Sequence, residues 1–187
     1  MSSLKGVNRG GRIYCGRQDL PGIHYQIGLL YRMYENTPSG DSRSIQEFDS
    51  ELKINPYDAW SEYRLGRVHL KGQETDDAIT HLRRAVRLDG TLVPARLVLA
   101  RALEGRGDVG GAREQLEAAS KIDPRNATVH YRLANIYKKG GNLAGSAEEM
   151  QRFEAIQAGK QGGQEDLHKA IRRAIEPEDE ESPDPHD

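Results

Sequence analysis

The sequence predicts an all-α protein, a right-handed solenoid of about four helical hairpins followed by a C-terminal capping helix. Three observations predict this fold class. A short pattern recurs at intervals of about 34 residues, the apolar residues of each copy have the three- and four-residue spacing of amphipathic helices, and glycine or proline separates the copies. Repetition at such an interval is typical of stacked helical units that cover one another's apolar faces.

The first helix of each unit is marked by an aliphatic residue followed directly by glycine or alanine. The pairs are Ile27-Gly28, Leu65-Gly66, Leu99-Ala100 and Leu133-Ala134. Their spacing equals the repeat interval, except that the step from the first pair to the second is longer by four. Because a small residue lets a neighbouring helix approach, we expect a close helix contact at each of these positions.

The second helix of a unit is marked by a stripe of alanine and leucine. The stripe appears as Ala78, Leu82 and Ala85 and recurs one interval later as Ala112, Leu116 and Ala119. Glycine-containing turns separate the first helices from the second ones. Pro56 and Pro124 stand between units, where proline stops one helix and can begin the next.

These residues resemble the tetratricopeptide repeat, a helix–turn–helix unit of about 34 residues. The resemblance covers about residues 21–156 and implies an array over 21–158. Its units would span about 21–58, 59–92, 93–126 and 127–158. The unit that begins at Val93 matches the family pattern best, and the last unit departs from it most, at Ser146, Met150 and Phe153.

The first unit fits the pattern only with four extra residues. We expect them in its turn, within Thr37–Ser44, so that Phe48, Glu51 and Leu52 fall on its second helix. Stacked units of this kind need at least three copies to form a continuous core, and the chain satisfies that requirement.

Three further segments flank the array. Residues 1–20 are expected to be a flexible leader, and the chain could be a piece of a longer protein. Beyond Gly162-Gly163, a stripe that includes Leu167 and Ile171 predicts a capping helix over 159–175. Residues 176–187 are expected to be a disordered tail with seven acidic residues and no lysine or arginine, which leaves about +5 on residues 1–175.

Composition excludes several classes of protein. Charged residues make up 30% of the chain and the mean hydropathy is −0.78. No apolar run approaches the roughly 20 residues that a membrane helix needs. The single cysteine, Cys15, excludes an internal disulfide and a cysteine-built zinc site. With no signal peptide recognisable, we expect no membrane span and a cytoplasmic location.

The sequence holds no recognisable catalytic constellation. The motifs of zinc proteases, serine hydrolases, phosphate-binding loops and dinucleotide-binding folds are absent. The six histidines are scattered; His24 and His130 share a repeat position but are three repeats apart. We therefore expect no enzymatic activity, no metal and no other cofactor.

The remaining candidate site is a surface. In tetratricopeptide arrays the first helices line a concave groove, and the resemblance carries six positions of each unit over to this chain. Of these 24 positions eight are basic, one is acidic and four are aromatic. The residues chosen as a partner-binding site are Tyr25, Arg32, Trp60, Tyr63, Arg64, Arg67, Lys71, Arg101, Tyr131, Arg132, Asn135, Lys138 and Lys139.

Such a groove suits an extended peptide with acidic and apolar side chains, because guanidinium groups pair with carboxylates and aromatic rings bury apolar area. The sequence therefore predicts a non-catalytic scaffold for a protein or peptide partner, alone or within a larger complex. The residue set with which some family members bind chaperone C-termini is matched only at Arg132, so that ligand is not expected.

Two alternatives stay open at this point. The basic positions could be no more than a solvated helix face. The groove could also bind nucleic acid, since tyrosine, tryptophan and arginine stack on bases. An isoelectric point near 6.3 and the acidic tail count against nucleic acid.

Overall fold

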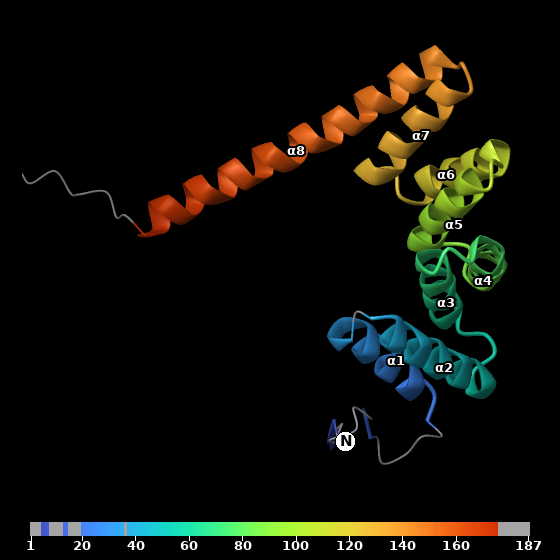
Figure 1. Cartoon of the computed structure of the whole chain (residues 1–187). Helices are drawn as coiled ribbons and strands as arrows, with labels where there is room; N and C mark the ends of the chain where they lie inside the picture. The colour runs from blue at the N-terminus through green and yellow to red at the C-terminus, as the bar shows by residue number, and fades with distance from the viewer. Residues whose placement is uncertain (1–4, 8–12, 15–19, 36, 176–187) are drawn as a thin grey trace, which may run out of the picture. The chain divides into compact units, whose positions relative to one another are not determined.

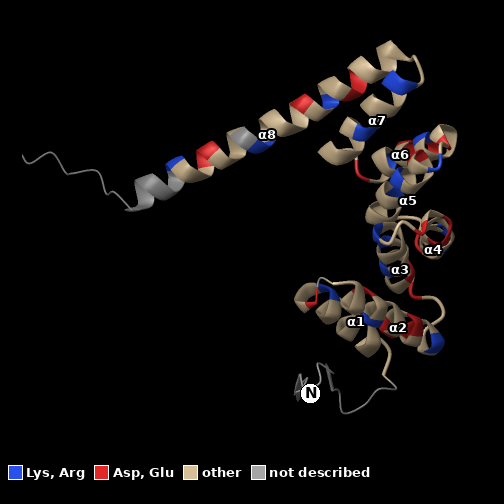
Figure 2. Cartoon of the chain, viewed as in Figure 1, with Lys and Arg blue, Asp and Glu red and all other residues tan. Residues whose placement is uncertain are grey.

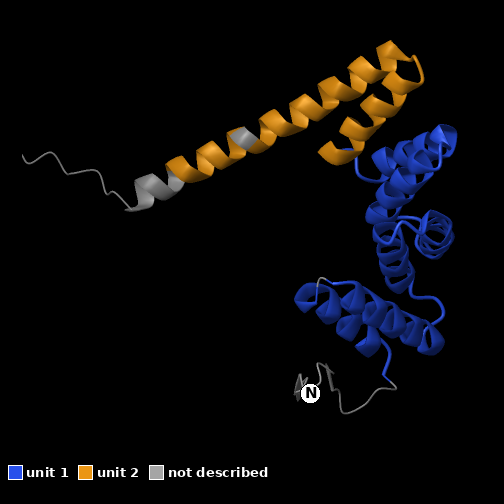
Figure 3. Ribbon diagram, viewed as in Figure 1, with its two compact units in different colours: residues 1–124 blue, residues 125–187 orange. Residues whose placement is uncertain are grey.

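Helices make up nearly all of the described part of the chain (Figure 1). The computed structural model describes residues 5–7, 13–14, 20–35 and 37–175. The chain divides into two compact units, residues 1–124 and 125–187, each of which is described by itself (Figure 3). None of the helices in the described residues is both long and apolar enough to cross a membrane.

The described residues of the first unit form six helices that pair in sequence order into three hairpins. Its helices are α1 (Ile23–Tyr34), α2 (Pro38–Ile54), α3 (Ala59–Lys71), α4 (Thr75–Leu88), α5 (Val93–Gly105) and α6 (Val109–Ile122). The second unit contains one hairpin, of α7 (Ala127–Lys139) and α8 (Leu143–Ile175). This arrangement confirms the predicted all-α fold of repeated helical hairpins.

Close contacts occur at the small residues that follow the repeated aliphatic positions. A Cβ atom on Gly66 would lie 2.5 Å from Cγ of Leu82, and one on Gly28 would lie 2.6 Å from the Phe48 ring. Ala100 and Ala134 are buried at the equivalent positions. The prediction that small residues permit close helix contact is therefore confirmed at Gly28 and Gly66.

Adding a methyl group at Gly66 is expected to lower the free energy of unfolding by about 1–3 kcal/mol, the usual range for overpacking. The new Cβ would meet Leu82, which is fully buried, and would lie 3.1 Å from the carbonyl oxygen of Ala78. Gly105→Ala is the control, because a Cβ there would meet nothing within 4 Å. Urea denaturation of both variants tests the packing; an unchanged stability for Gly66→Ala would contradict it.

The extra residues of the first hairpin lie in a helix rather than in the predicted turn. α2 begins at Pro38 and has 17 residues. The Thr37 hydroxyl accepts a hydrogen bond from the Gly40 N–H at 3.2 Å, and proline suits the first helical position because no partner is needed for its nitrogen. Phe48 and Glu51 are buried on this helix, which contains them as predicted.

The segment predicted as a separate capping helix is the second half of α8. This helix has 33 residues and runs without a break through Gly162 and Gly163. Leu167, expected to cover the last unit, is 59% exposed. A glycine within a helix costs only about 1 kcal/mol relative to alanine, so two of them need not end it.

The leader contains two short strands. β1 (Lys5–Val7) pairs with β2 (Ile13–Tyr14) in antiparallel fashion, a feature that the sequence did not predict. The other residues before Leu20, and the acidic tail over 176–187, lie outside the described residues.

A polar pair joins the two helices of each described hairpin at equivalent repeat positions. The pairs and their distances are His24–Glu47 at 2.6 Å, Glu62–His81 at 2.8 Å, Arg96–Gln115 at 3.0 Å and His130–Glu149 at 2.6 Å. Their members on the second helices follow one another at the repeat interval. The repeated pair fixes the register of one helix against the other, since each bond forms at only one alignment of the two.

Candidate functional site

A hollow with four basic residues in its lining is formed by the first helices of three successive hairpins. Its volume is about 680 Å³, and it lies wholly within the first unit. We call it the arginine hollow; it is lined by Arg32, Tyr63, Arg67, Leu70, Lys71, Gln73, Val98 and Arg101. Five of these eight residues were among the thirteen predicted partner-binding residues. Leu70 and Val98 occupy further first-helix positions of the 24 that the family resemblance carried over, and Gln73 is the exception.

Helix α3 supplies the largest share of this lining. Tyr63, Arg67 and Lys71 follow one another at four-residue intervals, which places them on one helix face. The start of α3 is fixed by Asp58, whose carboxylate accepts hydrogen bonds from the N–H groups of Trp60 at 3.1 Å and Ser61 at 3.2 Å. Figure 2 marks the basic positions along α3 and α5.

The positive charges of the hollow are only partly neutralised. Asp41 on α2 contacts both Arg32, at 3.5 Å, and Lys71, at 2.7 Å. Arg67 donates a hydrogen bond to the Tyr63 hydroxyl at 3.4 Å and lies over its ring, 5.6 Å from the centroid. Among the described residues no carboxylate forms an ion pair with Arg67 or Arg101.

The crowding of these cations affects Arg32. Burial lowers the pKa of its guanidinium from the ordinary value, and the nearby charges of Arg67 and Arg64 lower it further, against the opposing effect of Asp41. The cationic side chains therefore repel one another across the hollow. An anion placed among them would relieve that repulsion.

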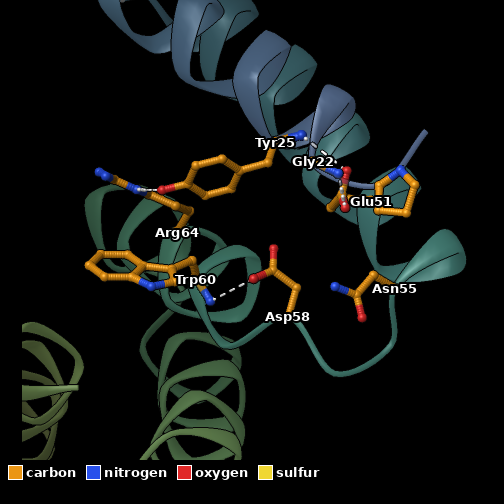
Figure 4. Close-up of a pocket in the computed structure, with 8 residues that line it drawn as sticks. Gly22, Tyr25, Glu51, Asn55, Asp58, Trp60 and Arg64 are labelled. Atoms are coloured by element: carbon orange, nitrogen blue, oxygen red, sulfur yellow. Dashed lines mark hydrogen bonds between the residues drawn. The ribbon is translucent and has the colours of Figure 1, made fainter. Parts of the chain in front are cut away.

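A second hollow, which we call the aromatic hollow, lies between the first and second hairpins (Figure 4). Its volume is about 650 Å³, and it is lined by Pro21, Gly22, Tyr25, Glu51, Asn55, Asp58, Trp60 and Arg64. Arg64 donates from Nε to the Tyr25 hydroxyl at 3.3 Å and lies 5.4 Å from the Tyr63 ring centroid. Trp60 remains 42% exposed, so its indole is available to an apolar side chain of a ligand.

Eight of the thirteen predicted site residues line these two hollows. The other five lie on α7 in the second unit and line neither of them; they are Tyr131, Arg132, Asn135, Lys138 and Lys139. Tyr131 packs against Phe153 of α8, with 5.5 Å between ring centroids, and the Asn135 amide donates to the Tyr131 carbonyl at 3.0 Å.

Some lining residues were not among the predicted positions. Asp58 had a sequence signal, because an aspartate directly before an amphipathic run marks a helix start. Glu51 had none, since it belongs to a second helix and reaches the aromatic hollow by contacting the start of α1. Gln73 lines the arginine hollow from a turn, with a φ of 66°.

One group in the described residues has metal-ligand spacing. Ligand atoms of His69, Glu74 and Asp77 lie within 4.8 Å of one another at the turn between α3 and α4. Nδ1 of His69 is already hydrogen-bonded to the Glu74 carboxylate at 2.5 Å, and the two carboxylates are exposed. We interpret the group as a hydrogen-bonded turn.

Comparisons with known proteins agree with the fold of repeated helical hairpins. Two family models match the chain, one described as TPR repeat over residues 100–141 and one as tetratricopeptide repeat over residues 63–113. No sequence among curated proteins matches.

Solved structures share the fold at low identity. A crystal structure of MamA is 18% identical with a TM-score of 0.68, covering 74% of this chain and 79% of that one. MamA from Desulfovibrio magneticus RS-1 is 22% identical with a TM-score of 0.66, covering 75% and 77%. YrrB, described as a TPR protein with an unusual peptide-binding site, is 24% identical with a TM-score of 0.62, covering 72% and 68%.

Proposed function

The chain belongs to the tetratricopeptide repeat family of protein-interaction scaffolds, and we propose that its first unit binds an extended segment of a partner protein. The segment would lie across the arginine hollow and the aromatic hollow. Acidic side chains would enter the former and apolar side chains the latter. The chain would act as a docking scaffold without catalysing a reaction.

The observation that carries this proposal is the composition of the arginine hollow. Three first helices converge on it and present Arg32, Arg67, Lys71 and Arg101 together with the apolar side chains of Leu70 and Val98. Arginine forks bind carboxylates through paired hydrogen bonds, and apolar walls strengthen those bonds by excluding water. The peptide-binding site in the description of YrrB supports a peptide ligand on this fold. The comparisons lend no support to nucleic acid as the ligand.

Reversing the charge of the two hollows should abolish partner capture. The test variant carries Arg64→Glu, Arg67→Glu and Arg101→Glu, and it is compared with the intact chain as bait in affinity capture. We expect the proteins bound through the hollows to be lost by more than tenfold, because six units of charge change across the two hollows, four of them where the ligand's acidic groups would lie.

A matched control carries the same charge change elsewhere in the first unit. Arg83→Glu, Arg87→Glu and Lys121→Glu lie on α4 and α6, are exposed and line neither hollow. This control should capture the same partners as the intact chain. Circular dichroism confirms that all three proteins are folded. Identical captured sets for the test variant and the intact chain would exclude the two hollows as the docking site.

A further inference from the structure

The arginine hollow has more positive charge than a single carboxylate can neutralise. Its lining contains four basic residues and no acidic one. Asp41 on α2 divides its one negative charge between Arg32 and Lys71. Arg67 and Arg101 have no carboxylate partner in the described part of the chain. A ligand group that neutralises this hollow should therefore carry more than one negative charge.

The origin of the cations also constrains the ligand group. Arg32 comes from the last turn of α1, Arg67 from the middle of α3 and Arg101 from α5. Three guanidinium groups from three separate helices therefore line one hollow. A planar carboxylate has two oxygens and one charge, whereas a phosphate monoester has three terminal oxygens and close to two charges at neutral pH.

We propose that the arginine hollow binds the phosphorylated side chain of a serine or threonine in the partner segment. This inference rests on the proposed function, because it specifies which side chain of that segment enters the hollow. Arg67 and Arg101 would donate to separate phosphate oxygens. Arg32, which also contacts Asp41, would supply a third positive charge. The mutual repulsion of the guanidinium groups that line the hollow would fall when the dianion enters.

The test uses three nonapeptide libraries that are degenerate at every position except the central one. The central residue is phosphoserine, glutamate or serine, and the amount retained on the immobilised full chain is measured by mass spectrometry. We expect the phosphoserine library to be retained at least about tenfold more than the other two, because the phosphate dianion accepts an additional charge-assisted hydrogen bond from the guanidinium groups. Treating that library with phosphatase should remove the difference.

Single neutralising variants locate the effect. Arg101→Gln or Arg67→Gln should reduce retention of the phosphoserine library about tenfold and retention of the serine library by much less. Arg83→Gln, on the exposed face of α4, should change neither.

Other results would overturn the inference. Equal retention of the glutamate and phosphoserine libraries would make the hollow a carboxylate site and leave the proposed function standing. If no library is retained while partner capture still depends on Arg64, Arg67 and Arg101, the phosphate inference fails and the proposed function stands. A further outcome is that inorganic phosphate, at a concentration equal to that of the peptides, elutes the phosphoserine library. The hollow would then be a small-anion site and not a peptide site.

Discussion

Replacing His81 with leucine is expected to lower the free energy of unfolding by about 2–3 kcal/mol, because it removes the close hydrogen-bond partner of a buried carboxylate. Nδ1 of His81 lies 2.8 Å from a carboxylate oxygen of Glu62, which is fully buried. Arg84 is 3.0 Å from the other oxygen, but that contact lacks hydrogen-bond geometry. Without His81, the Glu62 carboxylate would therefore be buried with a single poorly aligned partner.

Exchanging the two residues should restore most of that stability. In the second hairpin the glutamate is on the first helix and the histidine on the second, whereas His130 and Glu149 have the opposite order in the last hairpin. Arg152, three residues after Glu149, donates a hydrogen bond to that glutamate. Arg84 occupies the same repeat position, three residues after His81. The double variant Glu62→His with His81→Glu would reproduce the arrangement of the last hairpin.

Urea denaturation followed by circular dichroism measures all of these proteins, with the slope of the transition checked because repeat arrays can unfold in steps. Arg113→Leu is the control: its exposed side chain pairs with Glu117 one turn along α6, so a loss below about 1 kcal/mol is expected. If the double variant is no more stable than His81→Leu, the glutamate and histidine cannot be exchanged between the two helices of the second hairpin, which contradicts this expectation.

The arginine hollow could be predicted largely from the sequence because it depends on the repeat register. Once Leu65 and Leu99 fix the register, every first-helix position follows by counting, and helical geometry places equivalent positions on the same face. That is why five of its eight lining residues were among the predicted partner-binding residues, with Leu70 and Val98 at further first-helix positions. The register also predicted the buried alanines at 78, 85, 112 and 119.

The features that sequence reasoning missed depend on contacts between helices. The shared repeat position of His24 and His130 was visible, but nothing in the sequence indicated that Glu47 and Glu149 would face them. The length of α2 was not predicted, because Thr37-Pro38 was assigned to a turn. Threonine followed by proline is also a signal for the start of a helix. The continuity of α8 also escaped sequence reasoning. Two glycines weaken a helix without ending it, so the sequence pattern could not decide between one long helix and two shorter ones.

Truncating Glu51 to alanine is expected to destabilise the first hairpin by about 2–3 kcal/mol. Its carboxylate, 1% exposed, accepts hydrogen bonds from the N–H groups of Gly22 at 2.6 Å and Tyr25 at 3.4 Å (Figure 4). These N–H groups lie at the start of α1, and the N-cap residue Gly22, at φ 85°, supplies no side chain to cap it. Glu51 therefore caps α1 from another helix and places a negative charge at its positive end.

Hydrogen exchange distinguishes this role from a general loss of packing. In Glu51→Ala the amides of the first turn of α1 should exchange faster than those of α3, whose own cap at Asp58 is untouched. Glu51→Gln keeps an oxygen acceptor and should lose less, whereas Asp49→Ala, exposed on the same helix, should change stability by less than about 0.5 kcal/mol. Because Tyr25 extends from this turn into the aromatic hollow, Glu51→Ala should also weaken binding of apolar peptide side chains there. Uniform exchange over α1 and α3 would contradict the capping role.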